Sequence, residues 1–415
     1  MVTAIARARQ IDERLDHFRS SGLGVRKTGH QTLMEQFLAD LHHRADAGEI
    51  DPRTVRRYGA ALNHYRGFVE QTAIQRQFPH ISSANRDFAL SLMAYLNTVQ
   101  VPTNGRANSP SRPMRRPDYV LDVVRAMYCW ASELERGKLI PEGFRNPFFR
   151  HGRNGRNAAT VHLGEPDITM AMAVDFINAC DAYQLRLFAP LMIYGLRSAE
   201  PCFLVHEHLD RDWMRVPCLP ELAYQTKGRR EKQLPLSPCI AALLKSPLQS
   251  ATVGLLYLRR EAMTGMEKPL LVGKSLDDLV QEFRHRCTAP KVSTAANRRR
   301  LRDRVLHDAG GITYDHIVAE FKKLARALGW PRSATIKDFR HLFATCLENA
   351  GMPEHYRKFL LGQSPGRAAI VTYTHLNEIR QRFNEAVEKT LSPLVEAIER
   401  RSRDLGINLQ STNEE

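Results

Sequence analysis

Apolar side chains recur every three or four residues over much of this chain, and that spacing predicts helices. Residues 32–71 show the spacing twice, with an interruption at 48–52, which predicts a helical hairpin. Further helices are expected over 83–99 and 117–137. The N-terminal part is therefore predicted to be a small helical bundle.

The pattern changes in the second half of the chain. Residues 168–194 keep the helical period, whereas residues 206–235 alternate apolar and polar positions and predict two or three antiparallel strands. His206 and His208 fit this alternation as strand residues, and helices are expected again from about 238 to the end. The fold class is thus mainly α with a small antiparallel β-sheet in the second domain.

Three segments lack a clear period. Residues 101–118 are rich in Pro, Asn and Arg and predict a basic surface loop, and residues 147–166 are rich in Gly, Asn and Arg, as a linker between domains is. The basic segment 288–304 is weakly patterned, so a mobile loop, a DNA-facing segment and a solvated insertion all stay open. A chain of 415 residues is long enough for at least two domains.

Charge narrows the range of partners. The chain has 60 Lys and Arg against 45 Asp and Glu, a formal charge of +15. Such an excess favours a polyanionic partner, although it does not separate DNA from RNA or from an anionic membrane surface. No apolar run approaches the length of a membrane span, and the N-terminus resembles neither a secretory signal nor a transit peptide. The expected location is the cytoplasm, without a membrane partner.

Cysteine usage gives no sign of a disulfide framework or a metal site. The seven cysteines are odd in number and widely spaced, which is typical of reduced, mostly buried thiols. Cys202, His206, His208 and Cys218 lie close in sequence, but their spacing fits no standard zinc finger. Neither a metal nor another cofactor is therefore expected.

Two segments in the middle of the chain carry candidate chemistry. Arg197 and Glu200 lie three residues apart, so on a helix they share a face, where the carboxylate could orient the guanidinium. Taken alone, such a pair is most often a surface ion pair. Lys227 precedes Gly228 between two alternating runs, which indicates the tip or shoulder of a hairpin; by itself it would be a solvated turn.

Two later segments complete the pattern. Lys337, Arg340 and His341 lie at the start of a predicted helix that Gly351 ends, and a helix start favours a phosphate. A second helix, opened by Pro353 and closed at Gly362, follows. Tyr373 precedes Thr374 and His375 at the start of another amphipathic stretch, where an isolated tyrosine would most often be a packing residue.

Together these segments resemble the tyrosine recombinases, the family of phage integrases and Xer-type recombinases. In order, the family shows Gly-Leu-Arg-x-x-Glu, a lysine on a β-hairpin, His-x-x-Arg-His, Leu-Gly-His and Tyr-Thr-His. The matching residues are Arg197 with Glu200, Lys227, Arg340 with His341, Leu361-Gly362, and Tyr373 with Thr374 and His375. Lys337 and Gln363 depart from the pattern, because each stands where a histidine is usual. Gln363 loses a titratable group, which predicts a slower or an inactive enzyme.

The resemblance implies a two-domain clamp around duplex DNA, with a catalytic domain of the tyrosine-recombinase fold. It implies an N-terminal extension, expected to be helical, over 1–30, a helical (SAM-like) core-binding domain over 31–146, a basic linker over 147–166, the catalytic domain over 167–390 and a C-terminal helix or tail over 391–415. The partners implied are a homo-tetramer on two DNA sites and accessory DNA-bending or directionality proteins. The source implied is bacterial or phage-encoded.

The resemblance also implies a mechanism. Tyr373 would attack the scissile phosphate and form a 3′-phosphotyrosine, freeing a 5′-hydroxyl that later attacks the partner's phosphotyrosine. Arg197 and Arg340 would clamp the phosphate and Lys227 would protonate the leaving oxygen. Lys337 and Gln363 would bond phosphate oxygens or Tyr373, while Glu200 and His341 would support the arginines.

The enzyme predicted is thus a site-specific DNA recombinase that integrates, excises or resolves the DNA of a mobile element or replicon. Three other readings stay open: a catalytically silent relative that binds and organises DNA, a type IB topoisomerase, and an unrelated basic protein. The amphipathic stretch 383–400 could dock on a neighbouring protomer or pack within its own domain.

Overall fold

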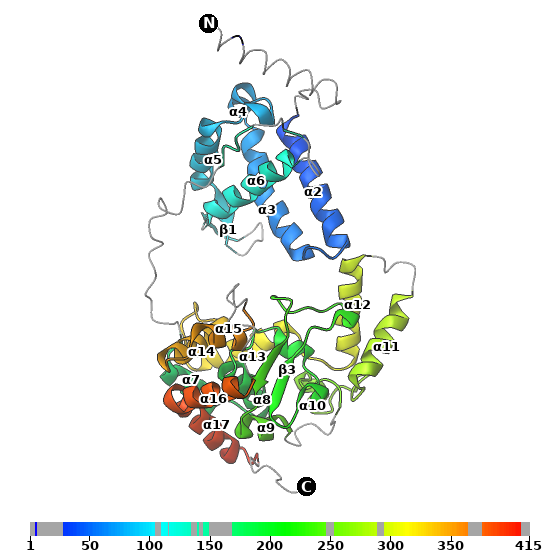
Figure 1. Ribbon diagram of the computed structural model, residues 1–415, viewed down its shortest axis with the longest axis vertical. Coiled ribbons are helices and arrows are strands. Elements are labelled where there is room, and N and C mark those ends of the chain that lie inside the picture. The colour runs from blue at the N-terminus through cyan, green and yellow to red at the C-terminus, as the bar shows by residue number, and fades with distance from the viewer. Residues whose placement is uncertain are drawn as a thin grey trace. The chain divides into compact units, whose positions relative to one another are not determined.

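A computed structural model of the chain describes Ile5 and residues 28–103, 109–114, 116–133, 139–140, 144–148, 168–245, 253–288, 294–363 and 376–407 (Figure 1). The chain divides into two compact units. Unit 1 is Met1–Ala159 with Thr294–Ala296, and unit 2 is Thr160–Ser293 with Asn297–Glu415. Nearly all of the predicted N-terminal extension and linker, and also Tyr373, Thr374 and His375, lie outside the described residues.

Unit 1 is a helical bundle with a small hairpin. Its elements are α2 (His30–Asp46), α3 (Pro52–Val69), α4 (Thr72–Gln77), η1 (Ile81–Ser83), α5 (Arg86–Thr98), β1 (Gln100–Pro102), β2 (Ser111–Pro113) and α6 (Pro117–Ser132). The predicted helical hairpin is confirmed as α2 and α3. The second helix begins at Pro52 because the side chain of Asp51 caps it and proline fits the first turn. The helices expected over 83–99 and 117–137 are confirmed as α5 and α6.

One prediction for unit 1 was incomplete. The segment expected to be only a basic loop includes β1 and β2, which pair antiparallel with Gln100 opposite Pro113. Proline is compatible with this pairing because each strand of a two-stranded sheet is an edge strand, whose outer N–H groups face solvent.

The core of unit 1 is aromatic, with Phe88 fully buried at its centre against Phe68 and Phe78. His30 stacks on Phe88 and bonds Tyr65 Oη (2.7 Å) and the Phe78 carbonyl (2.9 Å). Burial lowers the pKa of His30 to about 4, so this imidazole is neutral and packs as part of the core.

Unit 2 is mainly helical with one small sheet, as the pattern predicted. In order, its elements are α7 (Met170–Ala179), α8 (Ala182–Ile193), η3 (Glu200–Phe203), η4 (His206–His208), β3 (Trp213–Val216), η5 (Pro220–Leu222), β4 (Lys232–Pro235), α9 (Pro238–Lys245), α10 (Arg260–Met263), α11 (Leu276–Cys287), α12 (Ala295–Asp308), α13 (Tyr314–Ala327), α14 (Lys337–Asn349), α15 (Glu354–Leu360), α16 (Leu376–Ala386), the π-helical turn η7 (Val387–Leu391) and α17 (Ser392–Asp404).

The central helix of unit 2 is α8, which is buried on every face from Tyr183 to Ile193. A capping box between Asp181 and Gln184 begins this helix. Helix α17 packs against α7 and α8 through buried Leu394, Ala397 and Ile398. The C-terminal amphipathic stretch thus packs within its own unit, which was the second of the two possibilities for it.

Strands β3 and β4 form the predicted hairpin, with Trp213 opposite Pro235 and Val216 opposite Lys232. The connection between the strands, 217–231, contains Lys227. The strand prediction for His206 and His208 was wrong, because they form a short 3-10 helix. The Glu207 carboxylate accepts the backbone N–H groups of Leu276 (2.9 Å) and Gly254, and these tertiary bonds override the local alternation.

Of the three alternatives for 288–304, the mobile loop was wrong over 295–304, because α12 begins at Ala295. The guanidinium groups of Arg298 and Arg302 lie over the rings of Phe283 and Phe203, on the side of the helix where Val305 is buried. Arginine stems cover apolar surface here in place of leucine or valine. A hydrophobic period counted from apolar residues alone therefore misses this helix.

The seven cysteines are unpaired, and Cys180, Cys202, Cys239 and Cys346 are buried. In the described part of the chain, no three His, Cys, Asp or Glu side chains are grouped as metal ligands would be. Within the same residues, no helix combines the length and apolar character needed to cross a membrane.

Candidate active site

The first part of the candidate site follows the end of α8. Glu200, at the start of η3, is almost fully buried and accepts hydrogen bonds from the backbone N–H of Arg197 (2.8 Å) and from Arg197 Nη1 (3.0 Å). The predicted pairing of Arg197 with Glu200 is confirmed. The pair lies on a turn and a 3-10 helix rather than on one face of an α-helix. The carboxylate fixes both the main chain and the guanidinium of Arg197.

The second part is Lys232, which the sequence analysis missed. This lysine begins β4, its side chain is fully buried, and its Nζ donates a hydrogen bond to Glu200 Oε2. Alternation along β4 was the available signal, since Lys232 and Leu234 share the buried face of the strand. Burial lowers the pKa of Lys232 to about 8, against the opposing effect of the Glu200 charge.

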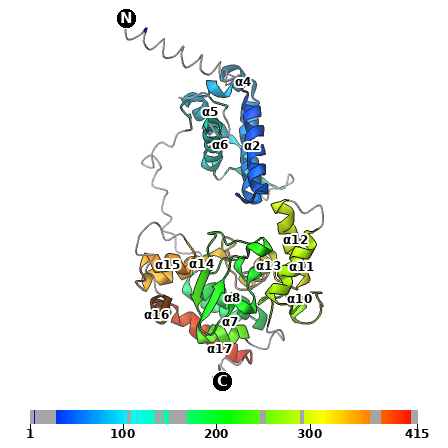
Figure 2. The same cartoon turned by 45° about the vertical axis from the view of Figure 1, so that its right-hand side comes forward.

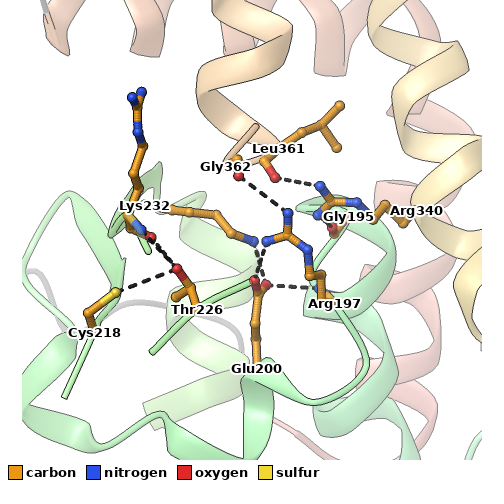
Figure 3. Close-up of polar contacts among 10 residues, drawn as sticks. Gly195, Arg197, Glu200, Cys218, Thr226, Lys232, Arg340, Leu361 and Gly362 are labelled. Atoms are coloured by element: carbon orange, nitrogen blue, oxygen red, sulfur yellow. Dashed lines mark hydrogen bonds and ion pairs between the residues drawn. The ribbon is translucent and has the colours of Figure 1, made fainter. Parts of the chain in front are cut away.

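The third part is Arg340 in the first turn of α14 (Figure 3). Its Nη1 donates to the Gly195 carbonyl (2.7 Å) and its Nη2 donates to the Leu361 carbonyl. Arg197 Nη2 donates to the next carbonyl, that of Gly362, at 3.3 Å. Burial, together with the nearby charge of Arg197, lowers the pKa of Arg340 to about 10. Successive carbonyls after α15 thus hold the two guanidinium groups side by side.

Two glycines make this close packing possible. Gly195 and Gly362 have φ of +54° and +58°, a conformation that residues with a Cβ rarely adopt. A Cβ at Gly195 would lie 2.4 Å from Cδ1 of Phe343, and a Cβ at Gly362 would lie 2.8 Å from Cε of Lys232. The glycines of the Gly-Leu-Arg and Leu-Gly boxes are therefore required by the site's own geometry.

The cluster holds more positive than negative charge. Arg197, Lys232 and Arg340 surround Glu200. Among the described residues, Glu200 is the carboxylate that bonds to these cations. Three cations against one anion leave an excess of two positive charges in a part-buried setting. The side chain of Arg197 stays 24% exposed, so the cluster is open to solvent. Two guanidinium forks with unbalanced charge suit an anion with several oxygens, such as a phosphodiester.

The remaining predicted residues surround the cluster or lie outside the described chain. Lys227 is exposed in the hairpin connection, and a Cβ on its neighbour Gly228 would lie 3.0 Å from the Gly362 oxygen. Gln363 is exposed directly after Gly362, and Lys337 and His341 are exposed on α14. The structure therefore brings Arg197, Glu200 and Arg340 together and adds Lys232. It leaves Lys227 and Gln363 at the edge of the site.

The buried lysine makes stability depend on pH. Between about pH 8 and about pH 10, we expect the wild type to gain stability relative to Lys232→Met. Below pH 8 the folded and unfolded states both carry the lysine proton, and burying this charge costs free energy. Above pH 8 the folded protein releases that proton while the unfolded chain keeps it up to about 10.5, so the unfolding free energy rises with pH.

Melting temperatures of the two proteins across this pH interval test the expectation. Lys245→Met, which replaces an exposed lysine at the end of α9, is the matched control and should show no such difference. A constant difference between wild type and Lys232→Met would mean that Lys232 does not release its proton in this range.

No protein-family model matches this chain, and no curated protein sequence matches it. Among solved structures, a complex of residues 82–397 of the Tn1549 transposon integrase with circular intermediate DNA is similar at 15% identity and a TM-score of 0.48, covering 85% of this chain and 98% of that one. A lambda integrase dimer bound to a COC′ core site is similar at 12% identity and a TM-score of 0.45, covering 91% and 87%. The integrase of mycobacterium phage Brujita is similar at 16% identity and a TM-score of 0.30, covering 91% and 94%.

Each of these three structures is of an integrase, the kind of protein that the sequence motifs resemble. At these identities and TM-scores, the similarity assigns no role to any residue of this chain. The function of the cluster therefore has to follow from its own geometry and charge.

Proposed function

We propose that this protein is a site-specific DNA recombinase that cleaves and rejoins strands through a 3′-phosphotyrosine on Tyr373. The observation that carries the proposal is the pair of guanidinium groups, Arg197 and Arg340, held side by side by backbone carbonyls with an excess of two positive charges. A phosphodiester supplies one negative charge and gains a second in the pentavalent transition state, and its two non-bridging oxygens match two planar donors.

Each side chain has a stated task in this reaction. The phenol of Tyr373 releases its proton to solvent and its oxygen forms a bond to phosphorus, while the bond from phosphorus to the 5′-oxygen breaks. Arg197 and Arg340 bind the non-bridging oxygens, which gain negative charge in the transition state. Lys227 donates the proton that the leaving 5′-oxygen takes up. Glu200 orients Arg197.

The remaining residues act around this centre. Lys232 acts as a positioning residue in this proposal, because its Nζ donates to Glu200, the carboxylate that orients Arg197. Lys337 and Gln363 bond phosphate oxygens or the tyrosine, and His341 supports the arginines. The partners in this proposal are double-stranded DNA, three further copies of the chain on two paired sites, and accessory DNA-bending or directionality proteins. The overall reaction integrates, excises or resolves DNA segments.

A covalent adduct tests the proposal. The pure full-length protein is incubated in EDTA with a nicked duplex that carries the candidate attachment site beside its gene, then run on a denaturing gel. We expect a protein–DNA band that resists denaturation, and nuclease digestion followed by mass spectrometry should place a nucleotide on Tyr373. Sequence-specific binding without any adduct would instead favour a silent DNA-organising protein, for which the Gln363 substitution is the supporting observation.

Removing one arginine of the pair should slow cleavage strongly. Arg340→Ala loses one phosphate-binding fork and leaves the carbonyls of Gly195 and Leu361 without their donor. We expect the single-turnover rate of adduct formation to fall about 10²–10³-fold, as for loss of one transition-state donor. The rate of Arg340→Lys should lie between those of the wild type and Arg340→Ala, because an ammonium keeps the charge but cannot reproduce the planar fork.

Arg326→Ala, at an exposed position on α13, is the control and should cleave normally. Melting temperatures separate an effect on chemistry from an effect on folding. A wild-type rate in Arg340→Ala would remove the arginine pair from the mechanism.

A further inference from the structure

Helix α12 carries arginines on two different faces. Along its seven residues 298–304 there are five arginines and one acid. Arg298 is exposed but lies over Phe283, and Arg302 lies over Phe203, so both are on the side of the helix that carries buried Val305 and Leu306. Arg300 and Arg304 are four residues apart and exposed, which places them on the opposite face, about one helical turn from each other.

The nearby acids are bonded to other arginines. The carboxylate of Asp303 accepts from Nε (2.9 Å) and Nη2 (2.7 Å) of Arg302. On the neighbouring helix α11, Arg286 bonds both Glu282 (2.6 Å) and Asp308 (2.5 Å). The outward face of α12 therefore carries the two positive charges of Arg300 and Arg304 beside acids that are already paired.

Arg302 connects α12 to the candidate active site. Its Nη1 donates to the carbonyl of Ala223 (2.8 Å), in the same hairpin connection that contains Lys227. In that connection Gly228 lies against the Gly362 carbonyl, which Arg197 also binds. The helix is thus fixed to the loop that borders the site. In both views of the chain, α12 lies at the opposite side of unit 2 from α17 (Figures 1 and 2).

We propose that the outward face of α12, through Arg300 and Arg304, binds backbone phosphates of duplex DNA beside the segment held at the active site. The choice of DNA as partner rests on the proposed function. Isolated like charges one turn apart on a helix repel each other, and a row of phosphates relieves that repulsion. Backbone contacts of this kind position the protein on DNA and carry no sequence preference.

The salt dependence of DNA binding tests the proposal on the full-length protein. Affinity for a mixed-sequence duplex is measured at several salt concentrations by fluorescence anisotropy, for wild type and for the double variant Arg300→Gln with Arg304→Gln. Each phosphate contact contributes about −0.9 to the slope of log affinity against log salt, so losing two should make the slope shallower by about 1.8. Glutamine keeps helix propensity close to that of arginine, so α12 should stay folded.

The matched control removes the same charge elsewhere in unit 2. Lys389→Gln with Arg403→Gln changes two exposed basic residues of η7 and α17 and should leave the slope as in wild type. Equal slopes in wild type and the α12 variant, or equal losses in both double variants, would overturn the proposal. A change seen only with duplex RNA would do the same. Failure to form the covalent adduct would refute the proposed cleavage and leave this slope measurement unaffected.

Discussion

Replacing Tyr373 with phenylalanine is expected to abolish the covalent adduct completely while DNA affinity stays that of the wild type. Phenylalanine lacks the oxygen that would bond to phosphorus, so the scissile strand stays intact. The arginine pair, Glu200 and Lys232 are unchanged by this substitution, and with them the anion site. The measurement is the adduct yield on a denaturing gel beside a binding titration of the same preparation.

Tyr314→Phe is the matched control, because Tyr314 is a half-exposed tyrosine at the start of α13, away from the motifs. It should form adduct as the wild type does. Adduct in Tyr373→Phe would show that another nucleophile performs the cleavage. Loss of binding together with loss of adduct would instead point to a structural role for Tyr373.

Lys227→Ala is expected to slow cleavage of an ordinary strand about 10²–10⁴-fold, the usual range for loss of a general acid. The leaving 5′-oxygen would then depart without its proton. A substrate with sulfur in place of this bridging oxygen has a leaving group that needs no proton, so wild type and variant should cleave it at similar rates. Recovery of the Lys227→Ala rate on the sulfur-containing strand would show that Lys227 donates a proton. If Lys227 only bound the DNA, the sulfur would not restore the rate.

Lys232 is the second lysine to compare in this assay, since its pKa of about 8 would also suit a proton donor. Lys232 is assigned as a positioning residue bonded to Glu200. Its replacement by methionine should therefore reduce cleavage of the ordinary strand and of the sulfur-containing strand equally. Recovery with sulfur in Lys232→Met but not in Lys227→Ala would exchange the two assignments. Lys245→Ala, at an exposed position, serves as the control.

Local periodicity was sufficient for most elements of this fold. Helices α2, α3, α5 and α6 of unit 1, the central helix α8 and the β3–β4 hairpin follow from apolar spacing and from turn residues, whereas the short α4 was not predicted. Where the prediction failed, a longer-range contact was decisive. Arginines packed on Phe203 and Phe283 stabilise α12, and the bonds of Glu207 to a distant loop hold His206 and His208 in a 3-10 turn.

Some residues of the candidate site could likewise be predicted from the sequence, and others could not. Arg197, Glu200 and Arg340 could be selected from motif order, and Tyr373 stays a prediction of the sequence. Lys232 was not selected, because a lysine in a basic stretch is ordinarily solvated; its alternation with Leu234 was the one sequence signal, and the packing of β4 shows that it is buried. Lys227, predicted as part of the site, lies on the exposed connection at its edge.

By itself, the sequence determined the helical class, the hairpin, the motif residues and the glycine that ends α14, Gly351, since each depends on residue type and near neighbours. Only the tertiary structure decided how the cations are held. Arg340 bonds a carbonyl 145 residues away and Arg197 bonds one 165 residues away. Every residue has a carbonyl, so no residue type marks these acceptors in the sequence. Their positions are set by the packing of α8, β4, α14 and α15 around a common core.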